Sequence, residues 1–302
     1  MPESGLAELL AQGSFDGVAA TAEGPPLAFA SQAGQGANTG RAWDPAAGSP
    51  LGPPLPDFPA DRAAWVFGAP AGSPTVAWTY RDRLHVHDLH TGHELTLDGQ
   101  PDLLAFAVHH GRAAVVAVFG PANDAQVVVR DALTGDGLAD FTVWLGHRTA
   151  IDRSVLHSAP ASGPLIGLPG DSAVGLLDVE RGEEIAALPS TCVLLAPSPD
   201  GLVVVEPTST ALTVRGLDGD RLATLPTPVP CDHVTAALVD GRLLVAAVRR
   251  DDPRALLAWN PESPEPSHHI ELPAPANDLA LTPTGTLLAA TESGLYKTHP
   301  CL

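Results

Sequence analysis

The chain is poor in basic residues. It has 16 lysines and arginines against 35 aspartates and glutamates, which gives a formal net charge of −19, and lysine is almost absent. A surface with this excess of negative charge repels the phosphate backbone of nucleic acids and the anionic headgroups of membranes. We therefore expect neither nucleic acid nor membrane among the partners of this protein.

Cysteine and long apolar runs are scarce as well. The three cysteines form no Cys-x-x-Cys pair, and their odd number argues against a disulfide framework. No stretch approaches the roughly 18 uninterrupted apolar residues of a membrane span, and the first residues lack the basic and apolar regions of a secretory signal. These absences predict a soluble, cytoplasmic protein. The heavy use of Ala, Gly, Pro, Arg and Asp resembles that of proteins from GC-rich bacteria.

Features that would predict catalysis are missing too. Aromatic residues make up only 5% of the chain, whereas sugar-binding sites usually need aromatic platforms. The carboxylate pairs Glu183-Glu184 and Asp251-Asp252 are adjacent in sequence, so their spacing does not indicate a glycoside hydrolase. Neither a Gly-x-Ser-x-Gly nucleophile elbow nor a complete phosphate-binding glycine loop occurs. We expect no enzyme activity and no cofactor.

Proline, glycine and small aliphatic residues are abundant instead. There are 31 prolines and 29 glycines, and 44% of the residues are hydrophobic. So many turn-forming residues are unsuited to a helical protein, and they are typical of many short strands joined by tight turns. The hydrophobic fraction is sufficient for a substantial core.

A short pattern recurs along the chain about every 43 residues. It consists of an apolar strand that ends in Asp or an equivalent residue, followed by a turn that contains Gly. The Asp-equivalent positions are Asp44, Asp88, Asp131, Asp178, Gly216 and Asn260, with a less regular seventh instance at Lys297. Glycine falls four residues after the first four of these positions, where a tight turn between antiparallel strands requires positive φ.

Each repeat holds four short strands. In the fourth repeat we predict strands over residues 151–156, 164–168, 173–177 and 184–188. Four strands in such a period predict an all-β fold, a seven-bladed β-propeller of four-stranded antiparallel blades that occupies residues 1–302 as a single domain. The first repeat is irregular, with Gly- and Pro-rich segments at 33–39 and 48–59 that we interpret as loops, so six or eight blades remain alternatives.

The same residues carry a family resemblance. Gly146-His147, then Asp171 and Val174, then Leu177-Asp178 and Gly182 follow in the order of a WD repeat, and Trp43-Asp44 is a literal Trp-Asp pair. Residues 15–302 therefore resemble the WD-repeat β-propeller family, in a divergent, bacterial-type form. The resemblance implies that His147 with Asp171, and His233 with Asp252 or the adjacent Asp251, form buried hydrogen-bonded networks that stabilise their blades. It does not imply catalysis by these histidines.

Closure of a propeller needs a partner for its last blade, because an unpaired strand edge invites aggregation. The seventh repeat supplies only three strands before the sequence ends. We predict that residues 5–11 form the closing outer strand of the last blade. A short helix over the same residues is the alternative, since Leu6, Leu9 and Leu10 also have helical spacing.

Two further groups of residues are candidate sites. His85 and His87 share one face of a predicted strand and are the candidate metal ligands, but no set of Cys, Asp or Glu with metal spacing completes them, so we predict no metal site. Arg148, Arg249 and Arg250 fall on predicted loops at one rim, where basic residues on an acidic protein could bind an acidic segment of a partner. Ordinary surface arginines are the alternative interpretation.

These observations predict a non-enzymatic scaffold or adaptor for protein–protein interaction that is monomeric on its own and presents the propeller rim to a protein partner. The alternative is an enzyme, or a small-ligand or metal-binding propeller, that uses the central channel. The predicted innermost strands are mainly apolar, which favours the scaffold.

Overall fold

The computed structural model describes residues 3–22, 26–34, 37–59, 61, 64–120, 124–144, 163–169, 173–189, 194–263, 265–266 and 268–299. The fold is a seven-bladed β-propeller whose blades are antiparallel and four-stranded, as predicted. Helical structure is almost absent, and one short 3-10 turn spans Pro70–Gly72. Within the described ranges, no helix has the length and apolar character needed to cross a bilayer.

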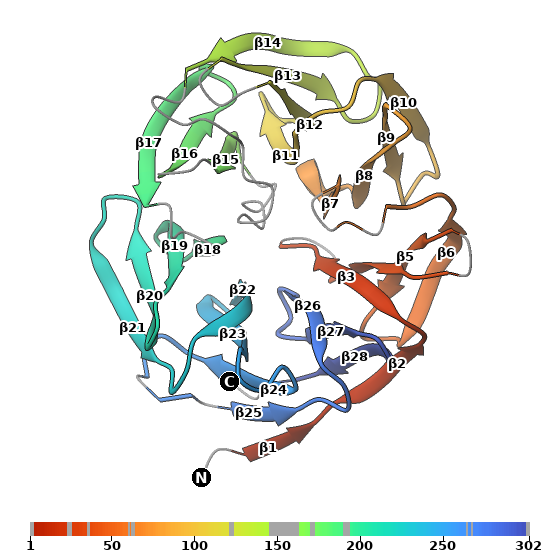
Figure 1. Cartoon of the computed structure of the whole chain (residues 1–302). Coiled ribbons are helices and arrows are strands. Elements are labelled where there is room, and N and C mark those ends of the chain that lie inside the picture. Colours follow the sequence, from red (N-terminus) through yellow and green to blue (C-terminus); the bar gives the residue numbers. More distant parts are fainter. Residues whose placement is uncertain are drawn as a thin grey trace. The chain divides into compact units, whose positions relative to one another are not determined.

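The chain divides into two compact units. The first unit, Met1–Ala60 with Ala196–Leu302, holds four sheets, and the strand β18 of one of them begins at Leu194, just before the boundary (Figure 1). Their strands are β3 (Phe15–Ala20), β4 (Ala28–Gln32), β5 (Thr39–Asp44) and β6 (Ser49–Leu55); β18 (Leu194–Ser198), β19 (Gly201–Pro207), β20 (Ala211–Gly216) and β21 (Arg221–Pro226); β22 (Cys231–Val239), β23 (Arg242–Arg249), β24 (Ala255–Trp259) and β25 (His268–Glu271), with β1 (Glu3–Leu6); and β26 (Ala276–Leu281), β27 (Leu287–Thr291) and β28 (Gly294–Thr298), with β2 (Glu8–Gln12).

The second unit, Asp61–Leu195, holds three sheets. Their strands are β7 (Trp65–Gly68), β8 (Thr75–Tyr80), β9 (Arg83–Asp88) and β10 (Glu94–Asp98); β11 (Leu103–His109), β12 (Arg112–Phe119), β13 (Ala125–Asp131) and β14 (Gly137–Val143); and β15 (Leu165–Pro169), β16 (Ala173–Asp178) and β17 (Glu183–Pro189). The strand predicted over 151–156 lies outside the described residues.

The recurring aspartate explains the sequence repeat. In the turns after β9, β13 and β16, one carboxylate oxygen of Asp88, Asp131 or Asp178 accepts two backbone N–H bonds, from the residues two and three positions later, at 2.7–3.1 Å. Its own carbonyl accepts the N–H of the glycine four positions later, at 2.9 Å in each turn. Asp44 makes the same contacts. The aspartate thus satisfies backbone donors that the turn would otherwise leave unpaired.

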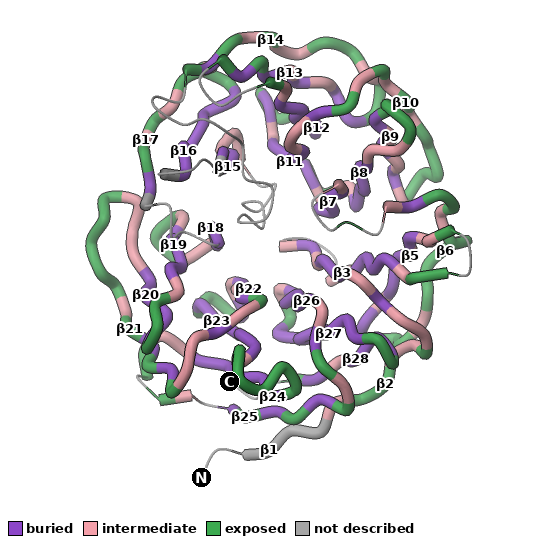
Figure 2. Tube along the Cα trace, in the orientation of Figure 1, coloured by how far each residue is buried: buried purple, intermediate pink, exposed green. Residues whose placement is uncertain are grey.

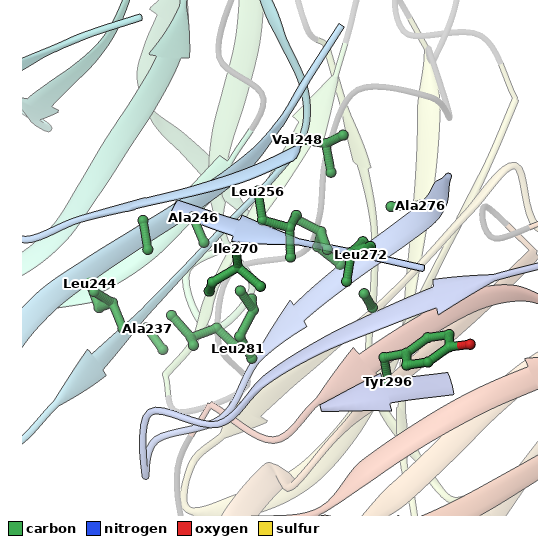
Figure 3. Close-up of a cluster of buried hydrophobic side chains, with 14 of the residues drawn as sticks. Ala237, Leu244, Ala246, Val248, Leu256, Ile270, Leu272, Ala276, Leu281 and Tyr296 are labelled. Carbon is green, nitrogen blue, oxygen red and sulfur yellow. The ribbon is translucent and has the colours of Figure 1, made fainter. Parts of the chain in front are cut away.

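Burial follows the position of a strand within its blade. The second strands β12 and β23 are buried on both faces, whereas the outer strand β10 alternates between exposed and half-buried residues (Figure 2). In the first unit, one apolar cluster joins neighbouring blades: Ala246 and Ile270 come from β23 and β25, and Leu281 and Tyr296 come from β26 and β28 (Figure 3). A fully buried Ile or Leu side chain stabilises the fold by about 1.5–3 kcal/mol, so these contacts hold adjacent blades together.

The segment predicted to close the last blade is divided between two strands. β2 (Glu8–Gln12) is the outer strand of the sheet β26–β28 and pairs antiparallel with β28. Gly5 and Leu6 belong instead to β1, which pairs in parallel with β25 of the preceding sheet. Ala7 joins the two strands and packs against the apolar cluster that the two blades share. No helix forms over these residues.

The first blade differs from the prediction. The segment 48–59, expected as a loop, contains the outer strand β6, which pairs with β5 across a register shift between Gly40 and Ala42. Proline can occupy this strand because an outer strand has no further neighbour to which it must donate a hydrogen bond. Composition alone therefore suggested a loop where the fold has an edge strand.

Candidate interaction surface on the blade formed by β22–β25

The predicted site residues do not all fall on the described chain. His147, Asp171 and Arg148 lie outside the described residues, so the first predicted His–Asp network and the first of the three arginines stay predictions. His233, Asp252, Arg249 and Arg250 all lie on the blade formed by β22–β25, in the first unit.

His233 and Asp252 do not form a buried pair. His233 is exposed, with φ of 48° in an irregular part of β22, where the register to β23 shifts between Asp232 and Thr235. Asp252 is also exposed, and its carboxylate accepts the backbone N–H of Arg254 at 3.2 Å. The expected network is therefore corrected here: the shift in register turns His233 to the surface and away from the blade core.

Arg249 and Arg250 are each held by an aspartate of the same blade. Arg249 donates Nε and Nη2 to the two carboxylate oxygens of Asp251 at 3.0 and 2.7 Å. Arg250 donates Nε and Nη2 to Asp232, with distances of 3.0 and 2.7 Å to Oδ1. The hydrogen bond from Arg249 is the main cause that lowers the pKa of Asp251. Both guanidinium groups are thus oriented by two-point contacts rather than left to move freely.

The backbone around these pairs is anchored on three sides. Arg250 N–H donates to the carbonyl of Pro230, and Ala276 N–H donates to Pro253, both at 2.9 Å. Arg254 donates Nε to the carbonyl of Leu272 at 3.1 Å and Nη2 to Glu271 at 2.6 Å. We call the set Asp232, His233, Arg249, Arg250 and Asp251 the charged patch.

The charged patch is open to solvent and nearly balanced in charge. The Arg250 and Asp232 side chains are 63% and 42% exposed, and Asp251 is 47% exposed. An acidic partner must compete with Asp232 and Asp251 for the arginines. A partner that carries both signs of charge can instead complement the aspartates and the outer edges of the guanidinium groups together.

Cys231 lies at the start of β22, directly opposite Arg249 in the sheet, and its thiol is buried. Burial raises the pKa of this thiol to about 11. Since the thiolate is the reactive form, Cys231 is unreactive at neutral pH and serves as a small apolar residue under the charged patch.

The histidines predicted as metal ligands lie on β9 in the second unit. The ring of His85 stacks on Trp78 with centroids 5.0 Å apart, and its Nδ1 is 3.5 Å from Glu94. His87 Nδ1 is buried and finds no hydrogen-bond partner among the described residues, and burial lowers the pKa of His87. In the part of the chain that the structure describes, no group of three or more His, Cys, Asp or Glu side chains is placed to hold a metal ion.

Sequence reasoning missed the partners that hold the arginines. Asp251 was expected in a carboxylate pair or in the network of His233, and Asp232 was not expected in any site. The two arginines followed directly by two aspartates, Arg249-Arg250-Asp251-Asp252, signalled local ion pairs. The pairing of Arg250 with Asp232, 18 residues away, depends on β22 lying beside β23.

Comparisons with known proteins agree with the fold. No family model matches the chain, and no curated protein matches it. Among solved structures, a chain titled "Structure of U3-55K" is similar with a TM-score of 0.63 and 13% identity, covering 97% of this chain and 98% of its own. A chain of the "Crystal Structure of Mitotic Checkpoint Complex" is similar with a TM-score of 0.64 and 14% identity, covering 99% and 91%. Both are WD40 propellers, and at these identities the likeness shows the fold alone.

Proposed function

We propose that this chain is a non-enzymatic scaffold or adaptor that binds a protein partner through the charged patch on the blade β22–β25. The observation that carries this proposal is the pairing of two arginines, Arg250 exposed and Arg249 half-buried, with aspartates of the same blade. Asp232 on β22 holds Arg250, and Asp251 on the loop after β23 holds Arg249, each in one orientation. Exposed ion pairs contribute little to stability, because water and salt screen them. Two such pairs at one end of a blade therefore favour a role in recognition.

A pre-oriented charged surface suits partner binding for a physical reason. Ordering flexible side chains on association costs free energy, and the two arginines of the charged patch are already paired with aspartates in the free protein. Complementary charge also raises the rate of encounter and excludes wrong partners. We further propose that the protein is bacterial, as its amino-acid usage suggests, and that it is cytoplasmic and monomeric before it meets its partner.

Charge-swap variants test this proposal. The double variant Asp232→Arg with Arg250→Asp keeps an ion pair at the same place but exchanges the positions of the two charges. The matched control is Arg83→Asp with Asp98→Arg, an exposed pair on the blade β7–β10. Each protein is first shown by circular dichroism and thermal unfolding to keep the fold, and is then used as bait for quantitative affinity purification.

We expect the unchanged chain and the Arg83/Asp98 control to enrich the same protein partner. The Asp232/Arg250 swap should lower this enrichment at least about tenfold, because the partner then loses a charge contact that is desolvated in the complex. Equal enrichment by all three proteins would exclude the charged patch as the binding surface. Absence of any reproducible partner would contradict the scaffold role.

A further inference from the structure

The blade β22–β25 differs from the other blades in having a fifth strand. Across the described sheets, the outer strands β6, β10, β14, β17, β21 and β2 have no further strand beyond them. Beyond β25 lies β1, which runs along its outer edge in parallel register, with Glu3 opposite His268 and Leu6 opposite Glu271 (Figure 1). A blade is therefore complete without a fifth strand. The outer edge of β25 nevertheless pairs with an extended segment.

We expect the pairing of β1 with β25 to be less stable than the antiparallel pairings within the blades. It is the one parallel pairing among the described strands, and parallel pairs are slightly less stable per residue than antiparallel ones. A glycine of β1, Gly5, stands opposite Ile270. A glycine has no side chain to contribute, and glycine within a strand weakens it.

Release of β1 leaves the closure of the propeller intact. The closing strand is β2, which pairs with β28 at Glu8, Leu9, Ala11 and Gln12. Lys297 of β28 reinforces this pairing, because its Nζ contacts Glu8 at 3.6 Å and donates to the carbonyl of Pro45 at 3.1 Å. Ala7 packs against the apolar cluster and separates the two strands. β1 can thus leave β25 while β2 stays in place.

The edge that β1 covers is suited to peptide recognition. In β25 the side chains alternate, with His268 and Ile270 buried and His269 and Glu271 exposed. Glu271 is held by Arg254 at 2.6 Å, and the N–H of Leu272 donates to the carbonyl of Arg254 at 2.8 Å, so the end of β25 is fixed. A rigid edge strand binds extended peptides through main-chain hydrogen bonds.

We infer that the outer edge of β25 is an acceptor site for an extended, proline-free segment of a protein partner, which adds in parallel in place of β1. The chain's own segment Glu3–Leu6 occupies the site in its resting state and shows the chemistry that fits it: about four extended residues with a small residue opposite Ile270. The site extends the proposed scaffold role to a second place on the same blade and does not depend on Arg249 or Arg250.

The test uses a chain that lacks residues 1–6 and a fluorescent peptide with the sequence of residues 3–7, which contains no proline. Because a tethered strand competes at an effective concentration near the millimolar range, we expect the shortened chain to bind the peptide at least about tenfold more tightly than the full chain in fluorescence anisotropy. Equal binding by the two chains, or no binding by the shortened one, would overturn the proposal.

Two methylated peptides identify the mode of binding. Successive amides of a strand point to opposite edges, so only one of the amides of Ser4 and Gly5 can face β25. N-methylation at one of these positions should abolish binding, and N-methylation at the other should leave it within about twofold. Equal effects of the two methyl groups would contradict strand addition.

Hydrogen exchange of the unmodified full chain keeps the proposal testable if the shortened chain does not fold. Amides of residues 3–6 should exchange at least about tenfold faster than those of β2, because β1 opens locally without global unfolding. Exchange of both segments at the same rate would overturn the proposal. Concentration-dependent dimers of the full chain that exchange β1 between copies would assign the site to a second copy, and so would overturn the partner assignment.

Discussion

Two sets of aspartates in this protein each make two-point contacts, and they differ in what they hold. Asp88, Asp131 and Asp178 are buried at strand ends and bind backbone N–H groups of their own turns. Asp251 is exposed, Asp232 is half-buried, and both bind arginine side chains. Buried carboxylates that satisfy backbone donors stabilise a fold, whereas exposed ion pairs mainly orient charges. Aspartate therefore stabilises the turns in one set and orients charged side chains for binding in the other.

The largest effect should come from removing a buried aspartate. Asp131 is 5% exposed, accepts two backbone N–H bonds and contacts Arg112 at 2.6 Å. We expect Asp131→Ala to lower the free energy of unfolding by about 2–4 kcal/mol, since two backbone donors and a charge lose their partner. Chemical denaturation measures the loss.

Two variants sharpen this prediction. Asp131→Asn keeps an oxygen for the backbone donors and should recover part of the loss. Asp251→Ala should leave the denaturation midpoint unchanged within error. A midpoint that falls as far for Asp251→Ala as for Asp131→Ala would erase the distinction between the two sets.

The turns that these aspartates organise can be compared at their glycines. Gly92 and Gly135 occupy the same position, with φ of 71° and 77°. A Cβ at Gly92 meets nothing within 4 Å, whereas a Cβ at Gly135 lies 2.9 Å from a methyl of Leu95 on the neighbouring blade. We expect Gly92→Ala to cost about 1 kcal/mol from backbone strain, and Gly135→Ala to cost about 1 kcal/mol more. Thermal unfolding of the two variants measures the difference, and equal losses would show that Leu95 moves aside freely.

The pH dependence of the free energy of unfolding should be set by the buried aspartates. Burial alone would raise the pKa of Asp131, but the N–H groups of Thr134 and Leu133 and the charge of Arg112 outweigh it, so the pKa is lowered. The pKa of Asp88 is lowered in the same way against burial, by Ser73, Thr91 and His90. A depressed pKa contributes stability that is present above the unfolded pKa of about 3.9 and is lost as pH falls through the folded pKa.

The free energy of unfolding should therefore decline as pH falls below about 4. The decline should be shallower in Asp131→Asn, because that variant has one fewer carboxylate to protonate. Urea denaturation at a series of pH values tests both statements, and an unchanged slope in the variant would remove Asp131 from the acid response.

Much of the fold could be predicted because the repeat is local. Each Asp and the glycine four residues later belong to one turn, and their hydrogen bonds do not depend on distant residues. The count of seven blades followed from the spacing of these turns. Residues 48–59 were misinterpreted because the prolines of β6 are compatible with both a loop and an outer strand.

The candidate site was less predictable because its contacts are not local. Arg249 and Arg250 were selected as surface arginines, but their orientation depends on Asp251 and, across the sheet, on Asp232. The family resemblance predicted burial of His233 and Asp252, and the register shift in β22 places His233 at the surface instead. A register shift is a property of two strands, so no pattern within one strand could indicate it.

The sequence by itself determined the repeat, its turns and most of its strands, because alternating burial and turn hydrogen bonds are encoded within a few neighbouring residues. Only the tertiary structure decided which edges and charges meet. The division of residues 5–11 between β25 and β28, and the pairing of Arg250 with Asp232, depend on segments that are distant in the chain. Such contacts depend on how whole strands align, and the sequence of either segment alone does not specify that alignment.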